Sequence, residues 1–319
     1  MSQTLSIVVS IFGLIGLGYG AARTGLLARN VGEGLTEFVF TVAIPLLLFG
    51  TLAEADLQGL SPWRVWAAYF PSFAIVWAVS HWTMRRVFGR DARAAVVGGG
   101  SAAYANAVLI GIPLILAAFG EGGTIYLIVV VAVHLPVMML ASVVLNEWAL
   151  REDGVEHEPA PRREVMHRLA VTLATQPILI AIVAGLLWRT SGAPLPAALT
   201  GIIEPLGRAA GPLALFASGM SLREFGVARQ IRPALVIAAL KLLLLPLLVL
   251  GAATALALPP LGVAVLTLTA ACPTGVNAFV IAGRLGTGQA LASNVLLFST
   301  AGGVVTVTLW LALLQGLLP

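Results

Sequence analysis

Apolar runs of about 20 residues alternate with short charged or Gly/Pro-rich segments along the whole chain. A run of this length crosses roughly 30 Å of hydrocarbon as a helix. The pattern therefore predicts ten membrane-spanning helices. In the first half they cover residues 4–22, 35–53, 65–87, 92–119 and 124–150, and in the second half residues 169–188, 199–220, 233–258, 261–284 and 290–318.

The second and seventh predicted spans share a pattern of residues that recurs 167 positions later. Gly34, Glu37, Pro45, Leu46, Leu48 and Phe49 correspond to Gly201, Glu204, Pro212, Leu213, Leu215 and Phe216. Because each unit holds five spans, an odd number, two copies lie in opposite orientations across the membrane, as in many secondary transporters. The pattern predicts a first repeat over 1–150, a cytoplasmic linker over 151–168 and an inverted second repeat over 169–319.

The composition supports a membrane protein. Of the 319 residues, 59% are hydrophobic and 10% are charged, whereas soluble domains carry about 25% charged residues. The first apolar run has no basic residue before it and no small-residue cleavage site after it, which predicts a permanent span rather than a signal peptide. The lipid bilayer is the expected surroundings of most of the surface.

Basic residues are distributed unequally between alternate loops. Arg64 and Arg189 lie on one predicted side, and 14 arginines lie on the other. Cytoplasmic loops are enriched in Lys and Arg, so this bias predicts an inner-membrane protein with both termini outside and the 151–168 linker inside. Because the basic residues are scattered between apolar spans and not gathered on one soluble face, a nucleic-acid partner is not expected.

The chain has few residues for redox, metal or nucleotide chemistry. Its single cysteine, Cys272, forms no internal disulfide, and its four histidines have no metal-ligand spacing. No Gly-x-x-x-x-Gly-Lys motif is present. We therefore expect no cofactor, no metal site and no ATP-driven transport by this chain alone.

Helix breakers fall at matching places in the fourth and ninth predicted spans. The fourth holds Asn106, Gly111 and Pro113, and the ninth holds Pro273-Thr274-Gly275 followed by Asn277. Irregular backbone in a membrane survives only where it is buried in protein or lines a wet cavity. Proline alone is more often a simple kink. The pairing of Asn, Gly and Pro in both repeats favours two broken helices that share a cavity, with half-helix N-termini suited to a carboxylate.

These breaks, with the proline-bearing second span, resemble the auxin efflux carrier family in its short bacterial form. The resemblance implies that helices 1, 2, 6 and 7 form a scaffold and that helices 3–5 and 8–10 form a transport domain whose fourth and ninth helices cross. It implies substrate contacts from Asn106 and Asn277 with Pro113 and Pro273 at the crossover, an elevator motion, and a homodimer. Substrates in the family are organic anions, namely malonate and malate in bacteria and indole-3-acetate in plants. The long central loop of plant members is absent here.

Five ionisable residues inside predicted spans are candidates for coupling or anion contact, because such residues are rare in membranes. Glu204 and Arg208 share a helix face, so either they neutralise each other or Arg208 contacts the substrate. Glu37 is either a proton-coupling carboxylate or a cytoplasm-facing residue near a helix end. Lys241 either snorkels or is buried beside an anion or ion-pair partner. His134 is either a proton shuttle or a hydrogen-bonded packing residue.

Together these features predict a secondary transporter, acting in efflux, of small organic anions such as carboxylates. Asn106, Asn277, Pro113, Pro273, Gly111, Thr274 and Gly275 are the predicted substrate-binding residues. The alternative within the transporter class is a sodium- or proton-coupled symporter of the bile-acid type, which has a related fold. A membrane receptor or an intramembrane enzyme is a further alternative, but an enzyme requires converging catalytic groups that this sequence lacks.

Overall fold

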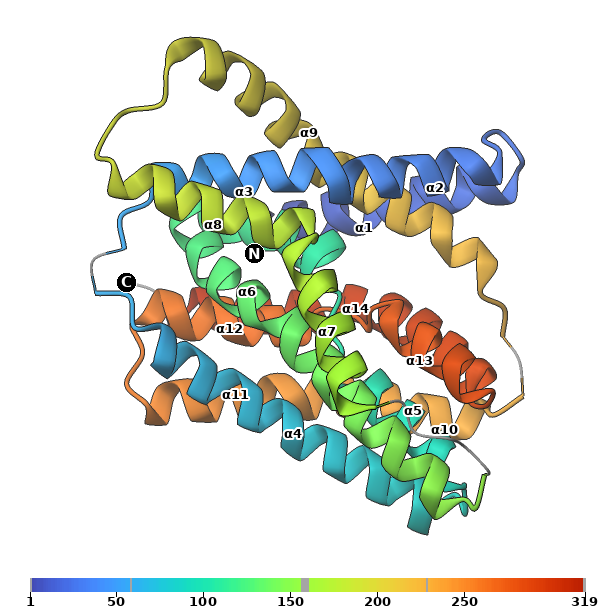
Figure 1. Ribbon diagram of the computed structural model, residues 1–319. Helices are drawn as coiled ribbons and strands as arrows, with labels where there is room; N and C mark the ends of the chain where they lie inside the picture. The colour runs from blue at the N-terminus through green and yellow to red at the C-terminus, as the bar shows by residue number, and fades with distance from the viewer. Residues whose placement is uncertain (1, 58, 156–160, 228, 318–319) are drawn as a thin grey trace.

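The computed structural model describes residues 2–57, 59–155, 161–227 and 229–317. In these ranges the regular structure is helical, apart from one isolated antiparallel bridge between Ala105 and Thr274 (Figure 1). The first half contains α1 (Ser2–Arg23), α2 (Arg29–Phe38), η1 (Val39–Ala43), α3 (Ile44–Ala53), α4 (Pro62–Arg86), α5 (Ala92–Ala103), η2 (Ala107–Gly111) and α6 (Ile112–Glu152). The second half contains α7 (Arg162–Ala174), α8 (Pro177–Thr190), α9 (Ala197–Ser221), η3 (Leu222–Glu224), α10 (Ile231–Ala239), η4 (Leu240–Leu244), α11 (Leu245–Ala255), α12 (Pro260–Ala271), α13 (Asn277–Leu285) and α14 (Gln289–Gln315).

Three π-helical turns interrupt these helices, and each lies directly before a proline. The turns η1, η2 and η4 end two residues before Pro45, Pro113 and Pro246. Proline has no amide hydrogen and its ring clashes with the carbonyl four residues earlier. A wider π turn accommodates that clash while the helix continues.

The ten predicted spans coincide with single helices or with helices separated by a short break, and the fourth and ninth contain non-helical residues at 104–106 and 272–276. Five helices are long and apolar enough to cross a membrane, and a sixth is added if the bent pair Arg163–Ala174 and Pro177–Thr190 is one span. That pair bends by 60°, and Gly120, with φ 66° and ψ −161°, breaks α6 between the fourth and fifth predicted spans. α4 and α9 are continuous over 25 residues each but are not among these membrane-capable helices, and α5, α12 and α13 are shorter. The count of ten spans therefore stays a prediction.

The helices form two packed groups. In one group, α9 packs against α1, α2 and α3, and α3 packs against α8. In the other, α4 contacts α5 and α11, and α14 contacts α10 and α12. Figure 1 shows the first group along the upper part of the view and the second below it, with η2 and α6 reaching from the second group to the first.

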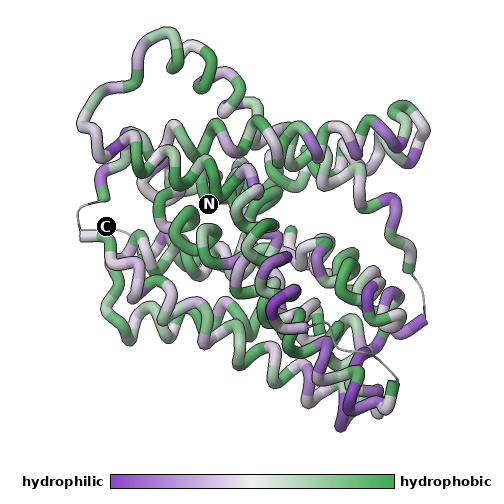
Figure 2. The backbone as a smooth tube through the Cα atoms, viewed as in Figure 1, coloured by the Kyte–Doolittle hydropathy of each residue, from purple (hydrophilic) through white to green (hydrophobic). Residues whose placement is uncertain are grey.

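Hydrophobic residues make up most of the helices, and many of the hydrophilic residues lie in the connections and near helix ends (Figure 2). Many large apolar side chains are exposed. Leu17, Leu187 and Leu309 each expose more than 60% of their surface on three different helices. Large apolar areas of this kind are typical of contact with lipid. The chain therefore presents the bilayer-facing surface that its composition predicts.

Candidate functional site

The two interrupted helices meet at their breaks. The chain is non-helical at 104–106 between α5 and η2 and at 272–276 between α12 and α13. The Asn106 amide donates to the Pro273 carbonyl at 2.8 Å, and the Gly275 amide donates to the Tyr104 carbonyl at 3.0 Å. Each break thus provides hydrogen-bond partners for backbone groups that the other break leaves unpaired. Backbone groups inside a membrane need such partners because no water is there to supply them.

The C-terminal ends of the half-helices α5 and α12 are closed by side chains. The Thr274 hydroxyl donates to the Ser101 carbonyl near the end of α5 at 2.8 Å, and the Thr274 amide donates to Ser299 Oγ at 3.0 Å. The Lys241 ammonium donates to the Ala270 carbonyl near the end of α12 at 2.6 Å. Both carbonyls would otherwise lack a donor, because the last four carbonyls of a helix have no intrahelical partner.

The N-terminal ends of the other half-helices open onto a cavity of about 190 Å³. Asn106 Oδ1 caps η2 by accepting from the Leu109 amide at 3.2 Å. The N-cap residue of α13 is Val276, which makes no side-chain cap. Amides of a first helical turn have no intrahelical acceptor and carry partial positive charge, so this cavity suits an anion.

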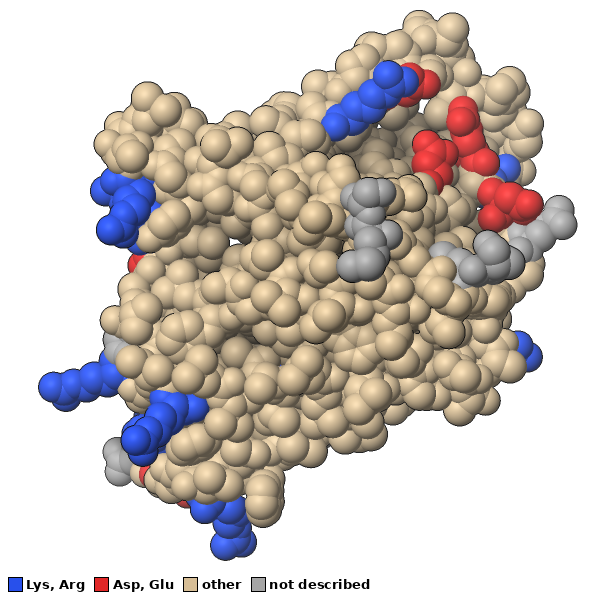
Figure 3. Space-filling view, turned by 180° about the vertical axis from the view of Figure 1, so that it is seen from behind, with Lys and Arg blue, Asp and Glu red and all other residues tan. Residues whose placement is uncertain are grey.

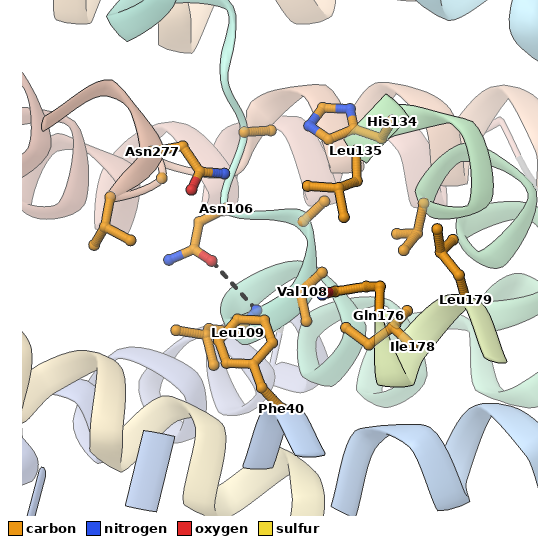
Figure 4. A pocket seen from close by; sticks show the side chains of 15 residues that line it. Phe40, Asn106, Val108, Leu109, His134, Leu135, Gln176, Ile178, Leu179 and Asn277 are labelled. Atoms are coloured by element: carbon orange, nitrogen blue, oxygen red, sulfur yellow. Dashed lines mark hydrogen bonds between the residues drawn. The ribbon is translucent and has the colours of Figure 1, made fainter. Parts of the chain in front are cut away.

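Both polar and apolar side chains line this crossover cavity. In Figure 4, Asn106 and Asn277 lie on one side, and Gln176, Ile178 and Leu179 lie on the other. The described lining residues include no Asp, Glu, Lys or Arg. The remaining lining residues are Phe40, Ala105, Ala107, Val108, Leu109, Val131, His134, Leu135, Gly275 and Val276.

Four of the predicted binding residues lie behind the cavity rather than on its wall. Pro113, Pro273, Gly111 and Thr274 are buried and do not line it. Gly111 donates to the Asn106 carbonyl at 2.9 Å, and Pro273 accepts from the Asn106 amide. These residues therefore shape the break, whereas Asn106, Asn277 and Gly275 reach the cavity.

His134 lines the crossover cavity and packs against aromatic rings. Its ring centroid lies 5.9 Å from that of Tyr69 and 6.5 Å from that of Phe73, both edge-on. Its Nδ1 atom is buried and has no hydrogen-bond partner in the described part of the chain. His134 is therefore not hydrogen-bonded in the way that one of the two sequence interpretations expects. Its unpaired Nδ1 atom belongs to a residue that lines the cavity.

Sequence reasoning missed Gln176 and Phe40 as lining residues. Gln176 is the N-cap of α8, at the 60° bend after α7. The available signal was a polar side chain directly before Pro177 inside an apolar run. Phe40 lies on the π turn η1, and nothing in its sequence context distinguishes it from neighbouring apolar residues.

Three of the predicted charged candidates, Glu37, Glu204 and Arg208, lie away from the crossover cavity. Glu37 lines a separate hollow of about 900 Å³ with Arg29 and Glu224, which are ion-paired at 3.0 Å. Glu204 and Arg208 form an ion pair, as expected from their spacing, and are 52% and 78% exposed. They line a third hollow, of about 170 Å³, with Glu54 and Glu121. The structure therefore does not bring Glu37, Glu204 or Arg208 to the crossover.

The sequence is similar to known transport proteins. A family described as "Membrane transport protein" matches residues 4–311. The chain is also 30% identical over 237 residues to a protein of Rhizobium meliloti (strain 1021) named "Putative malonate transporter". That alignment covers 70% of this chain and 68% of the other protein.

Proposed function

This chain belongs to the membrane transport protein family, which makes it an integral membrane transporter rather than an enzyme, and we propose that it is a secondary carrier of small organic anions such as dicarboxylates. The family match agrees with the resemblance to auxin efflux carriers that the two helix breaks indicated. The relative named as a malonate transporter makes malonate the first substrate to test.

The meeting of the two breaks is the observation that carries this proposal. It places the N-terminal ends of η2 and α13, with the side chains of Asn106 and Asn277, on one cavity. Free amides and asparagine side chains can donate hydrogen bonds to carboxylate oxygens, and the helix dipoles favour negative charge there. The cavity would thus bind an anion without a cationic side chain among its lining residues.

The size of the cavity favours a small solute. Sites for drug-sized molecules usually occupy about 300–1,000 Å³, and the crossover cavity has about 190 Å³. A short carboxylate is therefore favoured over a steroid-sized anion, which argues against a transporter of bile acids. His134 and Gln176 would add polar contacts from the other elements that line the cavity.

The arrangement of loops supports a ten-span topology with inverted repeats. In Figure 1 the connections at 191–196 and 256–259 lie at the left edge, and those at 24–28 and 286–288 lie at the right edge. Figure 3, seen from behind, shows more Lys and Arg side chains at the edge that bears the second set than at the opposite edge of this face. Under the positive-inside rule this edge is cytoplasmic, which places both termini outside a bacterial inner membrane.

The proposed mechanism is alternating access by an elevator motion. The scaffold would be α1–α3 with α7–α9, and the remaining helices would carry the crossover cavity past it. Glu37 lines the hollow on the inner side of this boundary, and Glu204 with Arg208 lines the hollow on the outer side. A potential of 100 mV, inside negative, favours exit of a monoanion by about 2.3 kcal/mol, or roughly fifty-fold, so export needs no coupled ion.

The experiment is a thermal-shift and uptake comparison of purified protein with malonate. A ligand at about 100 times its dissociation constant stabilises by roughly 2.7 kcal/mol, so malonate should raise the Tm of the wild type. Asn106→Asp keeps an oxygen that caps η2 but adds negative charge to the cavity, so the protein should stay folded and lose the malonate shift. Asn277→Ala should weaken the shift without removing a cap.

The control is Asn30→Ala, because Asn30 is an exposed asparagine at the start of α2, away from the crossover cavity. This variant should retain the full malonate shift and full malonate flux in proteoliposomes. If Asn106→Asp and Asn277→Ala both bind malonate as the wild type does, the substrate site lies elsewhere.

A further inference from the structure

Lys241 is the only lysine in the chain, since the other 17 basic residues are arginines. It lies on the π turn η4 and its side chain is fully buried. A lysine that merely snorkelled would expose its ammonium group at the membrane surface. Lys241 instead directs this group into the protein, toward α12.

The ammonium group of Lys241 closes the C-terminal end of the broken helix α12. Cys272 supplies donors to two of the last carbonyls, with its amide 3.3 Å from the Thr269 oxygen and its Sγ 3.5 Å from the Leu268 oxygen. Lys241 Nζ donates to the Ala270 carbonyl at 2.6 Å. In the described part of the chain no carboxylate forms an ion pair with Lys241, so its partner is the negative end of the helix dipole.

Pro246, five residues after Lys241, leaves a free carbonyl through which η4 is attached to α14. Because Pro246 has no amide hydrogen, the Leu242 carbonyl four residues earlier loses its helical donor. Trp310 Nε1 donates to that carbonyl at 2.9 Å and ties η4 to α14. The contact with α14 therefore helps to fix the position of the lysine next to the break.

The two half-helix C-termini are closed differently. The end of α5 receives the neutral hydroxyl of Thr274, whereas the end of α12 receives the ammonium of Lys241. In secondary transporters the C-terminal ends of half-helices are places where coupling cations bind.

We propose that Lys241 is a positioning residue whose tethered ammonium takes the place of a coupling metal cation at the end of α12. This cation keeps the break of α12 in the geometry that presents the N-terminus of α13 to the cavity. Anion binding at the crossover is then independent of Na⁺. The part that concerns anion binding rests on the proposed function, whereas the part that concerns helix closure does not.

The test compares wild type, Lys241→Ala and Lys241→Met in NaCl, choline chloride and ethylammonium chloride at equal ionic strength. The wild-type Tm and its malonate shift should be the same in NaCl and in choline chloride. Lys241→Ala should lower the Tm by about 4 °C or more, and ethylammonium should restore part of that loss because it fits the vacated space. Lys241→Met should be destabilised without rescue, because its side chain fills that space.

If Lys241 contributed only apolar packing, the rescue of Lys241→Ala would not depend on which cation is present. If ethylammonium and choline act alike on Lys241→Ala, or if Lys241→Met equals the wild type in Tm, the proposal is wrong. If Lys241→Ala does not fold, the comparison of the wild type in NaCl and in choline chloride decides. A higher Tm or a higher malonate affinity in NaCl overturns the proposal. Equal values in the two salts support it. The wild-type Tm could be independent of Na⁺ and ethylammonium could rescue Lys241→Ala while malonate leaves the wild-type Tm unchanged. That result would contradict only the proposed substrate.

Discussion

At the scale of single residues, Asp153 joins the ends of three helices. It is the C-cap of α6, and its carboxylate accepts from the Ala92 amide at 2.8 Å and from the Arg93 amide and Nε at 3.0 Å each, at the start of α5. Arg93 Nη1 also donates to the Leu285 carbonyl at the end of α13, at 3.5 Å. Partial burial raises the pKa of Asp153, but these hydrogen bonds and the guanidinium outweigh it, so the pKa lies below its ordinary value of 3.8.

Replacing Asp153 by asparagine should destabilise the protein in a pH-dependent way. A carboxyl whose pKa is lowered by folding contributes stability above its unfolded pKa, and that contribution is lost as the pH falls through the folded pKa. We expect Asp153→Asn to lower the free energy of unfolding by about 1–2 kcal/mol at neutral pH. The difference from the wild type should shrink once the pH falls below 3.8. Denaturation curves at several pH values measure this.

The control for this prediction is Glu152→Gln. Glu152 is the neighbouring residue, 47% exposed, with Arg85 at 3.4 Å, and exposed pairs contribute about 0–1 kcal/mol. Its removal should change stability little at any pH. An Asp153→Asn deficit of constant size from neutral to strongly acid pH would mean that lost hydrogen-bond geometry, not charge, causes the effect.

At the scale of helices, α1 and α9 pack with their backbones in close contact. A Cβ atom built on Gly219 would lie 2.0 Å from the Ile15 carbonyl oxygen, and one on Gly18 would lie 2.1 Å from the Phe216 carbonyl oxygen. Backbone atoms cannot move aside as flexible side chains can. Small residues therefore fix the distance between these two helices, as is common in membranes.

Gly219→Ala should separate α1 from α9 and destabilise the protein by about 1–3 kcal/mol. Gly16→Ala is the matched control, because it lies on α1 and nothing lies within 4 Å of a Cβ atom there. Alanine has the higher helix propensity, so the control should equal or exceed the wild type in Tm. Equal Tm values for both variants would contradict the proposed tight contact.

At the scale of the whole molecule, the unequal distribution of charge predicts how the chain sits in the membrane. The edge of the molecule rich in Lys and Arg lies opposite the edge where acidic side chains surround a hollow (Figure 3). Glu54, Glu121 and Glu204 line that hollow. Under the proposed topology, with both termini outside, we expect this acidic hollow to face the periplasm.

Cysteine accessibility can test this orientation directly. The native thiol, Cys272, is buried, so Cys272→Ser provides a background for single cysteines. Ser191→Cys, between α8 and α9, should react with a membrane-impermeant maleimide in intact cells stripped of their outer membrane. Asn30→Cys, at the start of α2, should react only after the inner membrane is opened. The reverse pattern would invert the topology, and labelling of both sites from outside would contradict the span count.

The sequence by itself determined the class of the protein and the place of its two helix breaks. Long apolar runs can only be satisfied by a bilayer, and Asn, Gly and Pro inside such runs interrupt a helix for local reasons that need no tertiary contact. Asn106 and Asn277 could therefore be predicted as cavity residues from their neighbours in the chain. The spacing of Glu204 and Arg208 predicted their ion pair in the same way.

Only the tertiary structure decided which residues share the cavity and which close the breaks. Gln176 reaches the crossover because α7 and α8 bend at that point, and Thr274 and Lys241 turn toward carbonyls of helices distant in sequence. Pro113, Pro273 and Gly111 carry the local signal for a break but lie behind the wall. A helix break has local causes, whereas the partner of each freed backbone group depends on which other helix packs against it.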